Sequence, residues 1–229
     1  MIIRNPPARR LAVLPWSRRR ILLAATLALG LLPSLAYAAA LPPPAALSSE
    51  DTLVLQRVAA YLNGIRTMTA HFTQYASNGV STGSLWVSRP GRMRFEYNPP
   101  NPILLIADTF YVYYYDKSLN QMQQVGLKST PAWLLLRDPI SFGTDVVVTH
   151  FERGNNLVRV TVVERADPDM GTLTMVFSES PVLLRQWIIV DQQGKTTTVS
   201  LSDEQFGMAL DPKLFQYQNP FAAARRDSN

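Results

Sequence analysis

The chain contains no cysteine and only two histidines among its 229 residues. Without cysteine it can form no disulfide framework, thiolate metal site or thiol nucleophile. His71 and His150 each fall within an alternating strand pattern, outside any H-x-x-x-H or H-E-x-x-H motif. The sequence therefore predicts solvated surface histidines and no metal site.

Catalytic motifs are also missing. The chain has no G-x-S-x-G elbow and no glycine-rich phosphate loop. A secreted glycan hydrolase remains a rival class, because it needs only two carboxylates facing each other in a cleft. The acids in question, Asp167 with Asp169 and Asp203 with Glu204, fall in turn-like or strand-end sequence where acids are common. We therefore expect a protein that is not an enzyme and that uses no cofactor.

Positive charge is concentrated at one end of the sequence. The chain has 22 Lys+Arg and 17 Asp+Glu, a net charge of +5. Its first 38 residues hold six arginines and no acid, which leaves 16 basic (22 − 6) against 17 acidic residues, a net charge of −1. The basic balance belongs to the leader, so we expect no nucleic-acid partner.

The leader has the three parts of a secretory signal peptide. Arginines precede the apolar stretch Ile21–Leu35, and Ala36-Tyr37-Ala38 offers small residues at a cleavage site, with a second possible cut at Ala38–Ala40. The stretch is shorter than the roughly 20 residues of a spanning helix, although an uncleaved anchor is the alternative. Arg18-Arg19-Arg20 leaves both the general and the twin-arginine export routes open. No cysteine follows either cut, so we expect an exported, soluble protein in the periplasm.

The remaining chain divides by composition into a short spacer, one folded domain and a tail. We assign residues 1–38 to the signal peptide, 39–49 to a proline-rich spacer, 50–221 to the domain and 222–229 to a flexible tail. About 190 residues can bury the core of a single domain.

The domain begins with one helix and continues mainly as strands. Apolar residues at helical spacing predict a helix from Glu50 to Asn63 that ends at Gly64. Eight or more short alternating segments with polar turns then predict a barrel or sandwich. A short apolar helix over Thr130–Asp138 interrupts them, with Pro131 at its start and Thr130 in the capping position.

Two features suggest a cavity. The strand Phe110–Tyr115 is aromatic or β-branched on both faces, which fits either a strand covered by a helix or a barrel wall that faces an apolar ligand. Arg89 continues the alternation of Leu85 and Val87 into a Pro90-Gly91 turn. It is either an exposed turn arginine or a residue at the cavity mouth that binds ligand oxygens or holds a lid through backbone carbonyls.

These segments together resemble a known family. In chain order the segments are Phe72-Thr73-Gln74, G-S-L-W-V-S-R-P-G-R-M-R-F-E-Y over 83–97, Asp108–Tyr113 and Thr130-Pro131. This order is similar to that of the LolA family of periplasmic outer-membrane lipoprotein carrier proteins. The resemblance implies a mainly β fold with a few helices: an incomplete, half-open antiparallel β-barrel covered by a helical lid. One departure is Thr109, where the family usually has glycine, and it puts the geometry of that turn in doubt.

The resemblance also implies a function. It indicates a chaperone that binds lipoprotein acyl chains and takes them from an inner-membrane ABC transporter (LolCDE-like) to an outer-membrane receptor (LolB-like), or directly to the membrane. The alternative is a periplasmic sensor or carrier of another lipid on the same fold. We expect a monomer, with Arg89 and Leu136 acting in the lid. The predicted acyl-chain cavity is lined by Leu85, Val87, Met93, Phe95, Tyr97, Trp133, Leu134 and Leu135.

Overall fold

A computed structural model describes residues 41–218 of the chain. The predicted signal peptide and the predicted C-terminal tail lie outside the described residues. The first helix, α1, spans Ser49–Gly64 and confirms the predicted helix. Ser48 caps it, because the Asp51 backbone N–H donates to Ser48 Oγ at 3.1 Å while the Asp51 carboxylate accepts from the Ser48 backbone.

Eleven strands form one sheet in the order β6-β5-β4-β3-β2-β1-β11-β10-β9-β8-β7, with antiparallel neighbours throughout. The sheet does not close, since β6 and β7 form its two edges. This confirms the predicted half-open antiparallel barrel. The strands are β1 Thr67–Ala76, β2 Gly79–Ser88, β3 Arg92–Tyr97, β4 Ile103–Asp108, β5 Tyr111–Asp116, β6 Gln121–Gly126, β7 Val146–Gly154, β8 Leu157–Glu164, β9 Gly171–Glu179, β10 Val182–Asp191 and β11 Thr196–Phe206.

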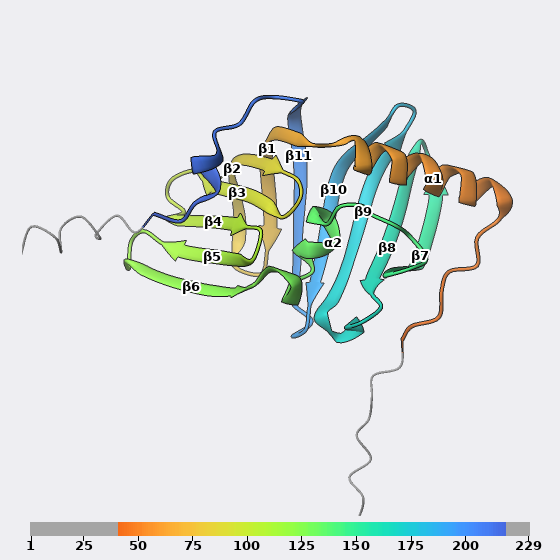
Figure 1. Cartoon of the computed structure of the whole chain (residues 1–229), viewed down its shortest axis with the longest axis horizontal. Helices are drawn as coiled ribbons and strands as arrows, with labels where there is room; N and C mark the ends of the chain where they lie inside the picture. The colour runs from red at the N-terminus through yellow and green to blue at the C-terminus, as the bar shows by residue number, and fades with distance from the viewer. Residues whose placement is uncertain (1–40, 219–229) are drawn as a thin grey trace, which may run out of the picture. The chain divides into compact units, whose positions relative to one another are not determined.

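The strand order explains why a short helix lies over the sheet. β6 and β7 are consecutive in the chain but occupy opposite edges, so the segment between them has to cross the concave face (Figure 1). This crossing segment carries a 3-10 turn, η1 (Leu127–Ser129), and the helix α2 (Ala132–Leu136). The topology itself thus provides the sheet with a cover.

The start of α2 differs from its prediction. Pro131 occupies the N-cap, and no side chain caps the helix. The Thr130 hydroxyl instead donates to the Leu127 carbonyl oxygen at 2.8 Å and completes η1. The capping role predicted for Thr130 is therefore wrong, because the preceding 3-10 turn offers its hydroxyl a nearer acceptor.

The longer helix covers the other half of the concave face. α1 crosses the ends of β10, β9 and β8 in Figure 1 and buries Val54, Leu55, Val58 and Leu62. Tyr61 packs edge-on against Phe177 with ring centroids 6.1 Å apart, and its hydroxyl accepts from the Leu184 backbone N–H at 3.1 Å. Apart from a space of about 20 Å³ beside Leu62, this half of the barrel is filled by side chains.

The C-terminal segment covers the outer face of β4 and β5. Its 3-10 turn, η3 (Pro212–Phe215), buries Phe215, and Tyr217 stacks on Tyr113 at 5.5 Å between ring centroids. The opposite face of β5 points Val112 into a cavity. The two-sided apolar pattern of this strand thus reflects a cavity on one face and a covering segment on the other, and that segment is not an α-helix.

Candidate functional site

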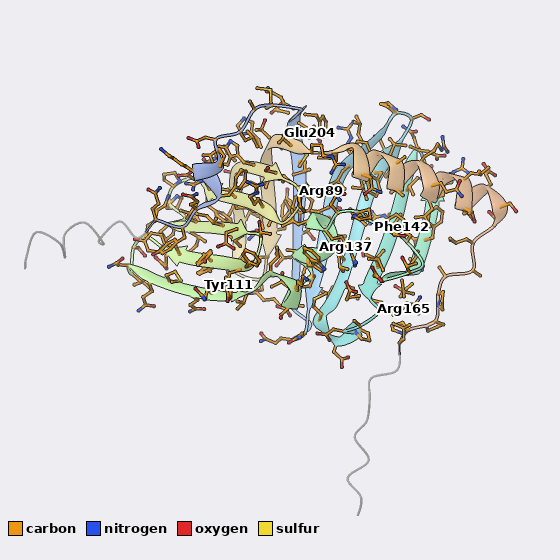
Figure 2. All side chains as sticks on the ribbon, in the orientation of Figure 1. Arg89, Tyr111, Arg137, Phe142, Arg165 and Glu204 are labelled. Carbon is orange, nitrogen blue, oxygen red and sulfur yellow. The ribbon has the colours of Figure 1, made fainter. Side chains whose placement is uncertain are left out.

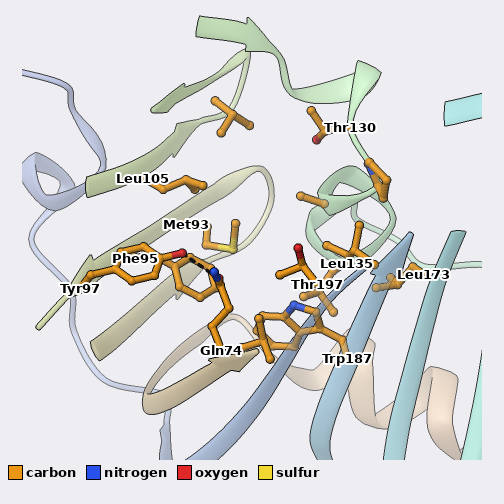
Figure 3. A pocket seen from close by; sticks show the side chains of 15 residues that line it. Gln74, Met93, Phe95, Tyr97, Leu105, Thr130, Leu135, Leu173, Trp187 and Thr197 are labelled. Atoms are coloured by element: carbon orange, nitrogen blue, oxygen red, sulfur yellow. Dashed lines mark hydrogen bonds between the residues drawn. The ribbon is translucent and has the colours of Figure 1, made fainter. Parts of the chain in front are cut away.

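A cavity of about 230 Å³ lies between the concave face of the sheet and α2. Its walls come from β1, β3, β4, β5, β9, β10 and β11, with α2 and the residues before it on one side (Figure 3). Nearly all of its surface is apolar. The lining residues are Gln74, Met93, Phe95, Tyr97, Leu105, Val112, Thr130, Pro131, Ala132, Leu135, Leu173, Trp187, Ile189, Thr197 and Val199.

Four of the eight residues predicted to line a cavity lie on this wall: Met93, Phe95, Tyr97 and Leu135. The other four lie elsewhere. Leu85 and Leu134 are fully buried in the packed core, and Val87 borders a second, smaller space. Trp133 lies beside the cations of Lys128 and Arg137, at 5.3 and 5.8 Å from its ring.

Aromatic rings form one wall of the cavity. Phe72 contacts Phe95 at 4.8 Å and Tyr97 at 5.1 Å between ring centroids, and Phe95 meets Trp187 edge-on at 6.2 Å. Gly83 on the intervening strand makes room for them, since a Cβ there would lie 2.7 Å from Cε1 of Phe72. This position therefore requires glycine.

Besides the threonines Thr130 and Thr197, one hydrogen-bonded polar pair interrupts the apolar lining. The Tyr97 hydroxyl donates to Gln74 Oε1 at 2.7 Å (Figure 3). Burial raises the pKa of Tyr97 to about 12, against a smaller opposing effect of the Gln74 hydrogen bond. The phenol therefore stays protonated, and a hydrogen-bond donor, at neutral pH.

Arg89 lies at the end of β2 and is only 8% exposed. Its Nη1 donates to the carbonyl oxygens of Leu62 and, at 3.4 Å, Ile65 at the end of α1, while its Nη2 donates to the Arg137 carbonyl oxygen at the end of α2. Burial lowers the pKa of its guanidinium, and no described residue accepts a hydrogen bond from its buried Nε. The alternative of an exposed turn arginine is therefore wrong: Arg89 joins the two helices (Figure 2).

The turn after Arg89 adds a second connection to α2. The Gly91 N–H donates to the Leu136 carbonyl oxygen at 3.0 Å, and the Gly91 carbonyl oxygen accepts from Thr109 N–H at 2.9 Å. Thr109 has φ = 96°, an unfavourable region for a β-branched residue. The β4–β5 hairpin thus forms with threonine at the position where the resemblance implied glycine.

Ion pairs hold the outer side of α2. Arg137 contacts Glu164 at 2.9 Å and Asp145 at 2.8 Å, and these bonds tie the end of the helix to β8 and to the loop before β7. The Arg137 and Glu164 side chains are each 13% exposed, whereas Asp145 is 66% exposed. α2 is therefore held at one end by backbone carbonyls and a partly buried ion pair.

A second space of about 20 Å³ lies next to the main cavity and borders Arg89. Leu135 of α2 lines both spaces. The remaining walls of the second space are formed by Leu62, Ile65, Met68, Val87, Arg89 and Leu184.

Residues that could support chemistry do not gather at this site. His71 is exposed, and His150 pairs with Glu152 at 3.0 Å on the surface, as predicted for both histidines. Among residues 41–218, no group of three or more His, Cys, Asp or Glu side chains is placed to hold a metal ion. Within the same residues, no helix combines the length and apolarity needed to cross a membrane.

Sequence comparison links the chain to characterised proteins. Residues 63–218 match the family model described as outer membrane lipoprotein carrier protein LolA. An outer-membrane lipoprotein carrier protein of Pseudomonas aeruginosa (strain UCBPP-PA14) is 32% identical over 195 residues, which cover 80% of this chain and 93% of that protein. One from Legionella pneumophila (strain Corby) is 32% identical over 168 residues, or 69% of this chain and 82% of that protein.

Structural comparison gives distant likenesses. A crystal structure of a LolA superfamily protein from Nitrosomonas europaea has a TM-score of 0.44 and 8% sequence identity, and the match covers 75% of this chain and 99% of that one.

Proposed function

Because this chain belongs to the outer-membrane lipoprotein carrier family LolA, a family of non-enzymatic transport proteins, we propose that it carries lipoproteins across the periplasm. In this proposal the acyl chains occupy the apolar cavity beneath α2. The carrier receives its cargo from an inner-membrane ABC transporter and delivers it to the outer membrane, through a receptor or directly.

The size of the cavity supports a carrier whose cavity is closed in this structure. Its volume of about 230 Å³ is below the range of about 300–1,000 Å³ that is usual for small-molecule pockets. Loading therefore requires expansion, and the position of Leu135 between the two spaces supports α2 as the element that moves.

Release requires that the closed state also be stable. Burial of an acyl chain contributes about 0.8 kcal/mol per methylene, so about fifteen methylenes would contribute about 12 kcal/mol, which corresponds to nanomolar binding for a single chain. A carrier with a permanently open cavity would retain its cargo. If opening breaks favourable contacts, only a fraction of the molecules is open. The measured affinity is then the affinity of the open state multiplied by that fraction.

The hydrogen bonds of Arg89 to both helices carry this proposal. A buried guanidinium that donates to Leu62 and Arg137 carbonyl oxygens holds the ends of α1 and α2 together beside the second, smaller space. When α2 moves, those bonds have to break, and their free energy opposes loading. Arg89 thereby sets the balance between the empty closed state and the filled open state.

Arg89→Leu tests this role. The variant should favour the open state, load lipoprotein at least as readily as the wild type, and deliver several-fold less of it in a reconstituted transfer assay. Arg185→Leu is the control, because Arg185 lies on β10 and pairs with Glu204 at 3.7 Å. Unchanged delivery by a folded Arg89→Leu protein would remove Arg89 from the mechanism.

Material bound to the protein from its own periplasm tests the cargo. Mass spectrometry should find triacylated or diacylated polypeptides in the purified fraction. Free phospholipids or other lipids without attached polypeptide would instead favour the sensor or alternative lipid carrier.

A further inference from the structure

Two nitrogen donors lie in the wall of the main cavity without an acceptor. Gln74 Nε2 and Trp187 Nε1 both belong to lining residues, and Trp187 is only 2% exposed. Within residues 41–218, the Gln74 side chain makes its hydrogen bond through Oε1, and no hydrogen bond has Gln74 Nε2 or Trp187 Nε1 as its donor. Neither nitrogen is among the fully buried side-chain atoms that lack a partner, so both are accessible from the cavity or its opening. Figure 3 shows Gln74 and Trp187 on the same side of the cavity, with the indole nitrogen on the ring edge turned toward the other lining residues.

Tyr97 fixes the orientation of Gln74. Its hydroxyl donates to Oε1, so the amide presents its NH₂ group, with two N–H donors, to the remaining space. Because the Tyr97 pKa is raised to about 12, the phenol keeps this role across the physiological pH range. The cavity wall therefore has a preset donor as well as an apolar surface.

Hydrocarbon cannot accept these hydrogen bonds. When an acyl chain fills the cavity and excludes water, an N–H group left there without a partner is destabilising, and a carbonyl oxygen can relieve that cost. Every acyl chain begins with an ester or amide carbonyl, whereas an alkyl chain linked through an ether has none. The two donors therefore distinguish ligands whose hydrocarbon parts are identical.

We propose that Gln74 and Trp187 form a donor pair that binds the carbonyl oxygen of an O- or N-acyl group, so that the cavity selects acylated over alkylated lipids. This inference rests on the proposed function and names a recognition element within the same cavity.

The donor pair also gives the ligand a direction. β1 begins next to Arg89, whose N–H donates to the Arg66 carbonyl oxygen at 2.8 Å, and Gln74 lies eight residues further along the chain. At about 3.3 Å per strand residue, the two sites are on the order of 25 Å apart. The carbonyl end of the ligand thus lies toward the β1–β2 hairpin, and its hydrocarbon extends under α2 toward Arg89.

Two synthetic lipopeptides with the same peptide and the same chain length test the proposal, one with ester-linked acyl chains and one with ether-linked alkyl chains. Calorimetry should show that the wild-type protein binds the acyl lipopeptide about threefold to tenfold more tightly, the usual net effect of one hydrogen bond. Gln74→Leu should reduce that ratio toward one, and Tyr97→Phe should reduce it partly because Gln74 loses its orientation.

Gln186→Leu is the matched control. Gln186 also makes a cross-strand side-chain hydrogen bond, to Ser200 at 3.0 Å, but it does not line the cavity. It should keep the wild-type ratio. Because the ratio compares two ligands on one protein, a general loss of stability lowers both affinities and leaves the ratio unchanged.

Each result decides one proposal. A ratio near one for the wild-type protein, or an unchanged ratio in Gln74→Leu, would overturn the donor pair while leaving acyl-chain transport intact. Failure of the wild-type protein to bind either lipopeptide would instead overturn the proposed function.

Discussion

The two halves of the barrel have different covers and different interiors. α1 has sixteen residues, a capping box and four buried apolar side chains, and the core beneath it is filled. α2 has five residues and no side-chain cap, and the main cavity lies beneath it. The difference shows that the length and anchoring of the cover decide whether the same curved sheet becomes solid or hollow.

The forces that hold the two helices also differ. α1 is held mainly by apolar burial, which is distributed along its length and is lost only when the helix leaves the sheet. α2 buries only Leu134, Leu135 and Leu136, and its end is held in addition by hydrogen bonds and ion pairs, which can break and re-form with a small displacement. This makes α2 suited to movement and α1 suited to remain in place.

The largest effect should come from truncating matched leucines on the two helices. Leu55 on α1 and Leu135 on α2 are 8% and 9% exposed. Leu55→Ala should cost about 3 kcal/mol of unfolding free energy, whereas Leu135→Ala should cost about 1–2 kcal/mol, because Leu135 already borders empty space and has fewer packing contacts to lose. Urea denaturation measures both values.

Uptake of a fluorescent hydrocarbon probe gives an independent measurement on the same pair. Leu135→Ala joins the two spaces beside it and should bind more probe than the wild type, whereas Leu55→Ala should not. Equal destabilisation together with equal uptake would contradict the division into a filled and a hollow half.

A smaller effect should follow from neutralising the ion pair at the end of α2. Glu164→Gln should cost about 1–2 kcal/mol because it removes the charge of the partly buried partner of Arg137. Asp145→Asn should cost less than about 0.5 kcal/mol, since Asp145 is mostly exposed. Hydrogen exchange of the Leu134–Leu136 amides should accelerate in the first variant only, and similar rates in both would show that the ion pair does not hold α2.

The smallest effect should be a pH dependence on the outer face of the hollow half. The Arg94 guanidinium, 2.9 Å from the Glu96 carboxylate, holds the pKa of Glu96 below its ordinary value, and Arg94 also donates to the Leu214 carbonyl oxygen at 3.2 Å. Because the folded-state pKa is lowered, this pair stabilises the protein above the ordinary pKa of about 4.3 and loses its effect as pH falls through the lower value.

Thermal unfolding of Glu96→Gln checks that sign. The variant should be less stable than the wild type by less than about 0.5 kcal/mol at pH 7, since Glu96 is partly exposed. At pH 3 the difference should shrink as the wild-type carboxyl group takes up its proton. A difference of the same size at both pH values would show that the ion pair is not its cause.

Much of the architecture could be predicted from local pattern. Helical spacing located α1, and strict alternation located the strands and placed Met93, Phe95 and Tyr97 on one face. The family resemblance is confirmed, and with it the half-open barrel. Alternation also placed Arg89 on the inner face, although its burial depends on the ends of two helices that are remote in sequence.

The composition of the cavity wall could be predicted only in part. Gln74 follows Phe72 by two residues, so the sequence predicts that both side chains point to the inner face of the sheet. The pattern of one strand does not predict which part of that face lines a cavity and which part is packed against other residues. Trp187 and Val199 reach the cavity from the distant part of the chain, through the β1–β11 and β10–β11 pairings. Leu85 alternates as Met93 does, but it is packed in the core, because the position of α2 decides where the space lies.

The acceptors of Arg89 are main-chain oxygens, which every amino acid possesses. Substitutions at Leu62, Ile65 or Arg137 can therefore change the side chain without removing the atom that Arg89 binds. No replacement at position 89 supplies the same fork of donors, and lysine offers only a single ammonium group. The hydrogen bonds themselves thus restrict only position 89, whereas the three acceptor positions are restricted by other contacts, such as the packing of Leu62 and the ion pairs of Arg137.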